Sequence, residues 1–285
     1  MTTGQPFDLD ATGEGFDAGT YGRSFADVYD RWYPSDEATV ASVDRLCALA
    51  PAGGTVLELG IGTGRLAIPL SERGLRVTGM DASPEMLDAL RRNVADATRT
   101  DGGGRPAVDI DARLGDVAAP GDWPPDRFDL VVATNNLLLN VAERSAQRRC
   151  ITRAAAALVA DGHLVIEMIV ARPFDADDSP GGRRDPGGKE AGVKEVEVKE
   201  VGPDGVVLIV TDTDPTTRVV TAAHVELRHG EPVHVRPWRV RLVTLDELDA
   251  WADEAGLELE ERWCDWSGQP FDDTATEAVS IYRPS

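Results

Sequence analysis

Apolar residues follow two spacings along this chain, and each spacing predicts a different element. Short apolar runs at 56–59, 75–80, 128–133 and 163–170 are typical of strands buried on both faces of a parallel sheet, and 108–114 alternates as a further strand. Between these runs, apolar residues three or four positions apart predict helices, including one from 143 to 158. Strands and helices in alternation indicate an α/β fold with a parallel sheet.

A second region has a different pattern. Residues 193–201, 206–212, 218–228 and 233–243 alternate strongly between apolar and polar side chains and are separated by turns. We expect an antiparallel sheet inserted between the fifth and sixth strands of the core, where it would wall a substrate pocket or mediate dimerisation. Thr244 and Glu247 then have the form of a helix capping box, and 257–263 with 278–282 predicts a closing antiparallel hairpin.

These patterns divide the chain into four parts. Residues 1–20 are predicted to be a mobile N-terminus and 21–172 the first part of the core. Residues 173–243 comprise a loop and the inserted sheet, and 244–285 complete the core. Within the core, Ser35 with Asp36 is predicted to open a helix, and Asp161-Gly162 is predicted to be a turn before the fifth strand.

The first core strand leads directly into a glycine turn. Gly60, Gly62 and Gly64 follow the strand, and a helix follows them. Because glycine has no Cβ, the backbone N–H groups of such a turn can approach a ligand at the helix N-terminus. An ordinary strand-to-helix turn is the alternative interpretation.

Two details bear on the kind of ligand. The dinucleotide fingerprint is G-x-G-x-x-G, whereas here Arg65 occupies the position of its last glycine. Glu58 lies just before the first glycine, where its carboxylate would repel a pyrophosphate and attract a cation. S-adenosylmethionine carries a sulfonium and an ammonium and has no phosphate.

The stretch from Val56 to Gly64, Val-Leu-Glu-Leu-Gly-Ile-Gly-Thr-Gly, closely resembles the first motif of the class I S-adenosylmethionine-dependent methyltransferases. The resemblance implies a Rossmann-like, seven-stranded methyltransferase sheet. It also implies a cofactor site in which an acid binds the ribose, two residues border the adenine, and a Gly-Asp-Val motif contacts the adenine ring. In this chain those residues would be Asp81 for the ribose, Ala82 and Met86 beside the adenine, and Gly115, Asp116 and Val117 at the ring.

The sequence Tyr29-Asp-Arg-Trp-Tyr33 resembles the N-terminal element that covers the cofactor in many small-molecule methyltransferases, including those that methylate amino sugars. Tyr21 and Tyr33 are the residues expected to cover it, although aromatic packing of a short helix is the alternative. Asn135 and Asn136 follow the fourth strand, at the sheet edge where α/β proteins bind ligands. They are expected to be either loop caps or cofactor contacts.

The sequence offers two candidates for a catalytic residue. His224 alternates with apolar neighbours in the inserted sheet and is expected to face the pocket. Glu167 lies inside the apolar fifth strand, either as a packed, hydrogen-bonded carboxylate or as one that faces the substrate. No histidine and acid cluster has the spacing of a metal site, so no metal is predicted.

Composition restricts the partners. The formal net charge of −21 disfavours binding to nucleic acids and to anionic membranes. No apolar run is long enough to span a membrane, no signal peptide is evident, and the three cysteines lack a C-x-x-C pair, which favours a cytoplasmic location.

These observations predict transfer of a methyl group to an O or N atom of a small molecule in secondary metabolism, antibiotic biosynthesis included, with S-adenosylhomocysteine as product. A homodimer is compatible with the inserted sheet. A non-methylating cofactor-binding member of the fold, either a cyclase or a regulator, is the alternative.

Overall fold

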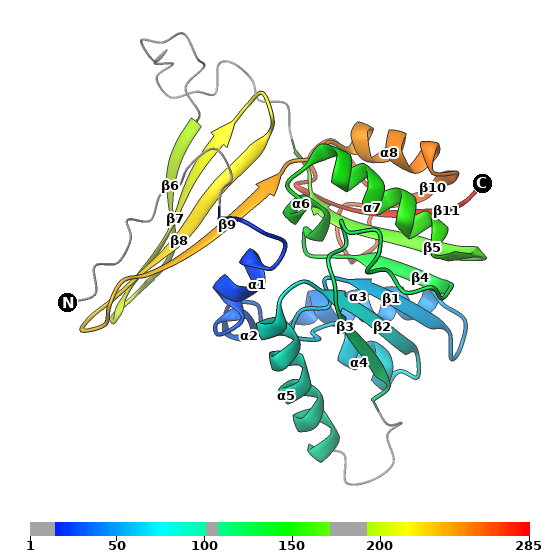
Figure 1. Ribbon diagram of the computed structural model, residues 1–285, viewed down its shortest axis with the longest axis horizontal. Helices are drawn as coiled ribbons and strands as arrows, with labels where there is room; N and C mark the ends of the chain where they lie inside the picture. The colour runs from blue at the N-terminus through cyan, green and yellow to red at the C-terminus, as the bar shows by residue number, and fades with distance from the viewer. Residues whose placement is uncertain (1–14, 101–107, 172–192) are drawn as a thin grey trace.

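The computed structural model describes residues 15–100, 108–171 and 193–285. They form a seven-stranded sheet flanked by helices and a separate four-stranded sheet that extends from one side of it (Figure 1). Of the predicted mobile N-terminus only residues 15–20 are described, and the part of the predicted loop at 173–192 lies outside the described residues.

The seven-stranded sheet confirms the predicted Rossmann-like fold. Its strand order is β10-β11-β5-β4-β1-β2-β3, and every neighbouring pair among the first five strands of the chain is parallel. β11 is antiparallel to both β5 and β10, which confirms the predicted closing hairpin. The strands are β1 (Thr55–Leu59), β2 (Arg76–Asp81), β3 (Ile110–Leu114), β4 (Phe128–Ala133), β5 (Leu158–Ile169), β10 (Leu257–Trp263) and β11 (Glu277–Pro284).

Helices cover both faces of this sheet. They are α3 (Glu37–Leu49), α4 (Ala67–Glu72), α5 (Pro84–Thr100), α6 (Leu137–Asn140), α7 (Arg144–Ala156) and α8 (Leu245–Glu254). Alternate residues of a strand point to opposite faces, so Leu57 of β1 packs in one apolar cluster with residues of α7 and α8. Val56 packs in a second cluster with residues of α3, α4 and α5. Burial on both faces explains why the strands are continuous apolar runs.

Helix termini follow local chemistry. Thr244 accepts from the Glu247 N–H, and the Glu247 side chain accepts from the Thr244 N–H, which confirms the predicted capping box of α8. At the start of α3 the N-cap is Asp36, whose carboxylate accepts from Thr39 N–H at 2.9 Å. Ser35 therefore precedes the cap, and the helix begins at Glu37.

The prediction of a turn at Asp161-Gly162 is wrong. These residues lie within β5, which begins five positions earlier than expected, at Leu158. The pairing with β4 is irregular there, since Phe128 pairs with Leu158 whereas Leu130 pairs with His163. The extra residues form a bulge, and glycine suits it because a Cβ on Gly162 would lie 3.0 Å from the Phe128 carbonyl oxygen.

The four-stranded sheet confirms the predicted insertion between β5 and β10. Its strands are antiparallel in the order β6-β7-β8-β9 and span β6 (Val193–Gly202), β7 (Gly205–Asp214), β8 (Val219–Arg228) and β9 (His234–Arg241). At the end of β9 the buried Arg241 donates to Gln147 of α7 at 2.8 Å and to Glu247 of α8 at 3.0 Å. Arg241 therefore fastens the inserted sheet to the core.

The N-terminal segment forms two short helices, α1 (Thr20–Phe25) and α2 (Tyr29–Trp32), between the inserted sheet and the core (Figure 1). The aromatic spacing predicts a single helical face across this segment, but the helix is interrupted between Phe25 and Tyr29. Arg236 of β9 explains the break: it donates to the Ser24 carbonyl oxygen at 2.7 Å and to both carboxylate oxygens of Asp27. A side chain from the inserted sheet thus caps the end of α1.

Candidate active site

A pocket of about 710 Å³ lies at the carboxyl ends of β1, β2 and β4. Its wall includes the glycine turn after β1, the segments after β2 and β3, and residues of α1, α6, α7 and β9. This is the edge at which open α/β sheets bind ligands. The pocket includes ten of the sequence-predicted cofactor residues: Tyr21, Gly60, Gly62, Asp81, Ala82, Met86, Gly115, Asp116, Val117 and Asn135.

The three glycines of the turn share a backbone conformation but differ in what surrounds them. All three have positive φ, 70° at Gly60, 55° at Gly62 and 88° at Gly64. A Cβ on Gly60 would meet Leu137, and one on Gly64 would meet Leu90, so both are needed for packing. A Cβ on Gly62 would have only the Gly60 carbonyl oxygen within 4 Å, at 3.8 Å. Gly62 is therefore the glycine whose missing side chain leaves space in the pocket.

Asp81 ends β2 and lines the pocket beside this turn. Its carboxylate accepts from the Gly62 N–H and from the Ser83 N–H, each at 2.9 Å. Burial raises the pKa of Asp81, and these two hydrogen bonds act against that rise. The carboxylate is thus fixed between the glycine turn and α5, with its remaining lone pairs available to ligand hydroxyl groups.

Glu58 lies under the glycine turn rather than in the pocket wall. It is only 4% exposed, and its Oε2 has no hydrogen-bond partner within the described part of the chain. Burial raises the pKa of its carboxyl group to about 8; Arg65 lowers it, and Asp81 adds to the rise. A buried carboxyl group with an unsatisfied oxygen is costly unless a donor or a cation arrives to satisfy it.

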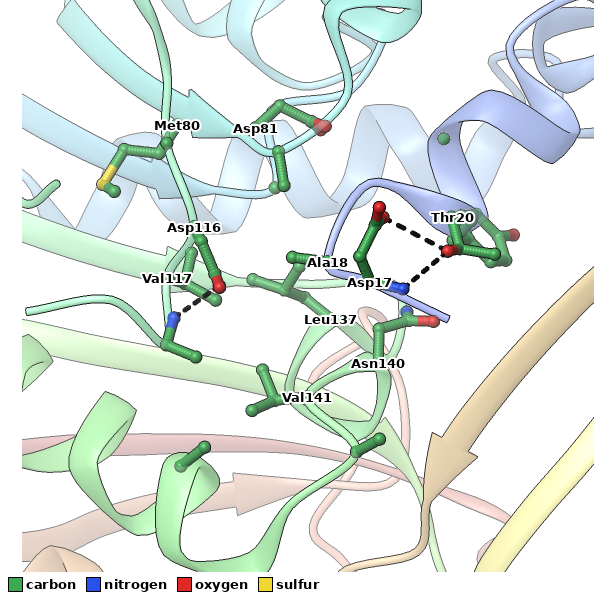
Figure 2. A pocket seen from close by; sticks show the side chains of 18 of the residues that line it. Asp17, Ala18, Thr20, Met80, Asp81, Asp116, Val117, Leu137, Asn140 and Val141 are labelled. Carbon is green, nitrogen blue, oxygen red and sulfur yellow. Dashed lines mark hydrogen bonds between the residues drawn. The ribbon is translucent and has the colours of Figure 1, made fainter. Parts of the chain in front are cut away.

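The opposite part of the cofactor region is formed by the turn after β3. Asp116 accepts from the Ala118 N–H at 2.8 Å, and its own N–H donates to Asp122 at 2.8 Å. Figure 2 shows Asp116, Val117 and Met80 on one side of the pocket, with Thr20 and Asn140 on the other. The predicted Gly115-Asp116-Val117 motif therefore lies together with Asp81, Ala82 and Met86 in one cavity.

Tyrosines of the N-terminal helices close the pocket from above the sheet edge. Tyr21 and Tyr29 line it, whereas Tyr33 is absent from the described lining and instead accepts from Lys199 Nζ at 3.3 Å. Burial and the neighbouring phenols of Tyr33 and Tyr29 raise the pKa of Tyr21 well above its ordinary value. Burial likewise raises the pKa of Tyr29 to about 12. Both phenols therefore stay protonated at neutral pH.

The two asparagines after β4 form a strained turn. Asn135 and Asn136 have φ values of 52° and 63°, in the left-handed region. The Asn135 N–H donates to Glu167 Oε2 at 2.8 Å, and Asn136 Oδ1 accepts from the Ile169 N–H at 2.7 Å. Asn135 also lines the pocket, whereas Asn136, like Gly64, lies outside the described lining. Asn136 is thus a turn residue, and Asn135 is a turn residue that also lines the pocket.

Of the two alternatives expected for Glu167, the structure shows the packed, hydrogen-bonded carboxylate and not the one that faces a substrate. Oε2 accepts from the Asn135 N–H, and Oε1 accepts from Trp266 Nε1 at 2.7 Å. The side chain is not among the described pocket-lining residues. Glu167 therefore holds the turn in place and is not positioned to act on a substrate.

The expectation that His224 faces the pocket is wrong. The ring is 5% exposed and lies among Phe25, Trp32 and Trp238, with ring centroids 5.1 to 6.1 Å away. Its Nδ1 accepts from Trp238 Nε1 at 3.0 Å. Burial, with the charges of Lys199 and Arg236, lowers the pKa of His224 to about 4. The alternation of β8 does separate two faces, and His224 lies on the inner one. That face packs on α1 and α2 and lies outside the described pocket lining.

Sequence reasoning missed several residues of the pocket. Tyr29, Asn140, Arg149 and Arg239 line it. Tyr29 could have been found, since it begins the Tyr-Asp-x-x-Tyr sequence used to predict Tyr33. Arg149 and Arg239 lie in an ordinary polar helix and an ordinary alternating strand, and nothing in their local sequence distinguishes them.

Two observations show that the pocket suits S-adenosylmethionine. Glu58 places a buried carboxyl oxygen without a described partner beneath the glycine turn, and a cationic ligand above that turn would favour its ionised form. Gly62 leaves open space beside Asp81, whose carboxylate can accept from ribose hydroxyls. When bound, this cofactor supplies a methyl group made electrophilic by its positive sulfur.

The strand order, the glycine turn and the acids after β2 and β3 define an α/β protein of the seven-stranded methyltransferase class. The family described as a methyltransferase domain matches residues 56–162. The CcbJ methyltransferase from Streptomyces caelestis is 31% identical, with a TM-score of 0.79 and coverage of 95% of this chain and 100% of that one. The chain therefore belongs to the S-adenosylmethionine-dependent methyltransferase family.

More distant proteins share the fold or the core alone. CalS10, an amino pentose methyltransferase from Micromonospora echinaspora solved with S-adenosylmethionine, is 19% identical with a TM-score of 0.58, covering 90% of this chain and 95% of that one. Ribosomal RNA small subunit methyltransferase A from Anaeromyxobacter sp. (strain K) is 36% identical over 118 residues, covering 36% of this chain and 39% of the relative. The chain thus matches about two fifths of the length of this curated relative.

Two searches of the described residues bear on other classes of site. No group of three or more His, Cys, Asp or Glu residues in 15–100, 108–171 and 193–285 could hold a metal ion. In the same ranges, no helix combines the length and the apolar character needed to cross a membrane.

Proposed function

We propose that this protein transfers the methyl group of S-adenosylmethionine to a nitrogen or oxygen atom of a small molecule of secondary metabolism. One observation carries the proposal: the cavity lined by Asp81 and Asp116 is also lined by Asn140 of α6 and Arg239 of β9. A volume of about 710 Å³ lies within the range of small-molecule sites. Donor and acceptor can therefore occupy one enclosure.

In this proposal the residues act mainly by position. Asp81 and Asp116 fix the nucleoside end of the cofactor, and Tyr21 and Tyr29 exclude water above it. Holding two reactants in line at near-attack distance is worth up to about 7–11 kcal/mol of the barrier. The glycine turn and α1 provide rigid surfaces on two sides of the pocket, so little rearrangement is required of the protein.

An amine is the favoured acceptor. There is no histidine among the described residues that line the pocket. The phenols of Tyr21 and Tyr29 are already protonated at neutral pH, because their pKa values are raised, so they cannot act as bases. A hydroxyl acceptor would need a base, whereas a neutral amine brings its own lone pair. Support for a small natural-product acceptor comes from the likeness in fold to CalS10, an amino pentose methyltransferase involved in calicheamicin biosynthesis.

The remaining parts of the proposal concern partners and location. The net charge of −21 disfavours nucleic acids and anionic membranes as partners. We place the protein in the cytoplasm, and we propose that the inserted sheet, which exposes Val196, Val198 and Val201 on its edge strand, supports a homodimer.

The first test is ligand binding followed by product release. Thermal shifts would be recorded with S-adenosylmethionine, S-adenosylhomocysteine and NAD for the wild type, Asp81→Ala and Asp253→Ala, the last being a control at an exposed acid of α8. We expect shifts with the two sulfur ligands that Asp81→Ala abolishes and the control preserves. A panel of amines and alcohols should then elicit S-adenosylhomocysteine release.

Two results would contradict the proposal. A shift with NAD in place of the sulfur ligands would mean that the glycine turn has a different ligand. Cofactor binding without S-adenosylhomocysteine release for any amine or alcohol would favour the alternative, a cyclase or a regulatory protein with this fold.

A further inference from the structure

Arg239 is an arginine without a partner in the wall of the pocket. It lies on β9, which packs against both α1 and α6, and its Nε is buried with no hydrogen-bond partner among the described residues. The other arginines near it on the inserted sheet are paired: Arg228 and Arg236 with Glu226, and Arg218 and Arg241 with Glu247. An unpaired, partly buried guanidinium is costly unless a ligand completes it.

One further group of the pocket wall has unmet hydrogen-bonding capacity. Arg149 of α7 is not that group: it lines the pocket but is exposed, and burial with the charge of Asp116 raises the pKa of its neighbour Cys150, so Arg149 belongs with the adenine region. Asn140 of α6 lines it as well, and its Oδ1 is buried without a partner in the described ranges. Figure 2 shows Asn140 on the side of the pocket away from Met80 and Asp116. Because β9 packs against α1 and α6, the helices of Thr20 and Asn140, Arg239 and Asn140 belong to the end remote from the adenine region.

The charges that face this end leave a surplus of positive charge. Of the acids that line the pocket, Asp81 and Asp116 belong to the cofactor region, and Asp17 pairs with Arg23 at 2.6 Å. Glu143, exposed at the start of α7, is the remaining described acid. Among the described residues Arg239 thus has no carboxylate partner, in a chain whose net charge is −21. Such a local inversion of charge is typical of a site that selects an anion.

We propose that the acceptor carries an anionic group, a carboxylate or a phosphate, which Arg239 binds. This inference rests on the proposed function and adds a substrate class to it. The guanidinium fork matches the planar geometry of both anions. The amide of Asn140 offers an acceptor oxygen for a hydroxyl or ammonium next to the anionic group. The reacting atom would then be directed towards the glycine turn.

The carboxylate of the cofactor is the alternative ligand for Arg239. The two possibilities predict different consequences for Arg239→Gln. If Arg239 binds the acceptor, the affinity for S-adenosylhomocysteine will be unchanged. If it binds the cofactor, that affinity will fall. Arg239→Lys keeps the charge and loses the fork, so it tests the geometry separately from the charge.

The experiment is an isothermal titration of the full chain saturated with S-adenosylhomocysteine. Inorganic phosphate and acetate are the probes, with ionic strength held constant by NaCl, and the proteins are wild type, Arg239→Gln, Arg239→Lys and Arg153→Gln. Arg153→Gln is the control: it makes the same substitution at an exposed arginine of α7, outside the described pocket lining.

We expect at least one probe to bind the wild type and the control equally. Arg239→Gln should weaken that binding by at least about tenfold, which is about 1.4 kcal/mol at 25 °C, and Arg239→Lys should weaken it less. Preference for phosphate or for acetate then identifies the anion.

Three outcomes would overturn the inference: no binding of either probe, equal binding to Arg239→Gln and wild type, or an equivalent loss of S-adenosylhomocysteine affinity in Arg239→Gln. A failure of the anion titration with cofactor binding intact leaves the proposed function standing. Loss of cofactor binding in the wild type would refute the proposed function itself.

Discussion

At the scale of single residues, the buried carboxyl group of Glu58 destabilises the ligand-free protein as pH rises. Its buried carboxyl group has a pKa of about 8 against an ordinary value of 4.5. Between these values the folded protein holds a proton that the unfolded chain has released, so stability falls as pH rises through this window. The penalty grows by about 1.4 kcal/mol for each pKa unit. A cation in the pocket would favour the ionised form and relieve it.

We therefore predict opposite effects of Glu58→Gln on stability and on binding. The variant should raise the unfolding temperature of the ligand-free protein at about pH 8, with a smaller effect at about pH 5. It should also weaken S-adenosylmethionine binding by about tenfold or more at the higher pH, because it cannot become a carboxylate. Calorimetry at both pH values measures the two effects, with Glu231→Gln as an exposed control. Parallel losses of stability and affinity would contradict this account.

Residues recognisable from a motif could be predicted at this scale. Asp81 and Asp116 follow strands at the sheet edge, and their positions in the chain identify them. Glu167 and His224 could not be assigned, because their surroundings come from distant segments: Trp266 for Glu167, and Phe25 with Trp238 for His224. A sequence pattern gives the face of a strand but not what covers that face.

At the scale of elements, Glu247 joins four parts of the chain. It belongs to α8 and pairs with Arg144 of α7, Arg218 before β8 and Arg241 of β9, at 2.8, 2.7 and 3.0 Å. Burial opposes its ionisation, but the hydrogen bonds from Arg144 and Arg241 hold the pKa of Glu247 below its ordinary value. Its stabilisation is therefore present above about pH 4.5 and is lost as pH falls through the folded-state pKa.

We predict that Glu247→Ala lowers the free energy of unfolding by about 3 kcal/mol, because it leaves the buried Arg241 without its carboxylate. Thr244→Ala is the matched comparison: it removes only the cap of the same helix and should cost about 1 kcal/mol. Urea denaturation at neutral pH measures both. Equal losses in the two variants would mean that Glu247 acts only through the capping box.

Element boundaries were predictable where local chemistry sets them. The cap of α8 and the strand β4 follow directly from their residues. The break between α1 and α2 was not predictable, since the group that caps α1 is Arg236, more than two hundred positions away. The bulge in β5 was missed for a related reason: Asp161-Gly162 has the composition of a turn, and its pairing with β4 decides otherwise.

At the scale of the whole molecule, the excess of acids is a source of self-repulsion. With 50 acidic and 29 basic residues, long-range repulsion opposes the compact state. Ions screen such repulsion over about 8 Å at physiological ionic strength. We predict that NaCl raises the unfolding temperature from low to physiological ionic strength, as measured by scanning calorimetry. A fall in that temperature would mean that the individual ion pairs outweigh the net charge.

The overall architecture was predictable, including the inserted sheet, because strand periodicity repeats over many residues and single misassignments do not alter it. The closure of the pocket was not, because it depends on α1, α6 and β9 meeting in space. Periodicity along the chain contains no information about that meeting.

The division of the pocket wall between segments has a consequence for diversification. The residues proposed to bind the cofactor come from the ends of β1, β2 and β3 and the loops after them, whereas Arg239, proposed to bind the acceptor, comes from the inserted sheet between β5 and α8. Substitutions on β9 can therefore alter which acceptor is accepted without disturbing the glycine turn or Asp81. A lineage with this architecture can acquire new acceptors while its donor chemistry stays fixed.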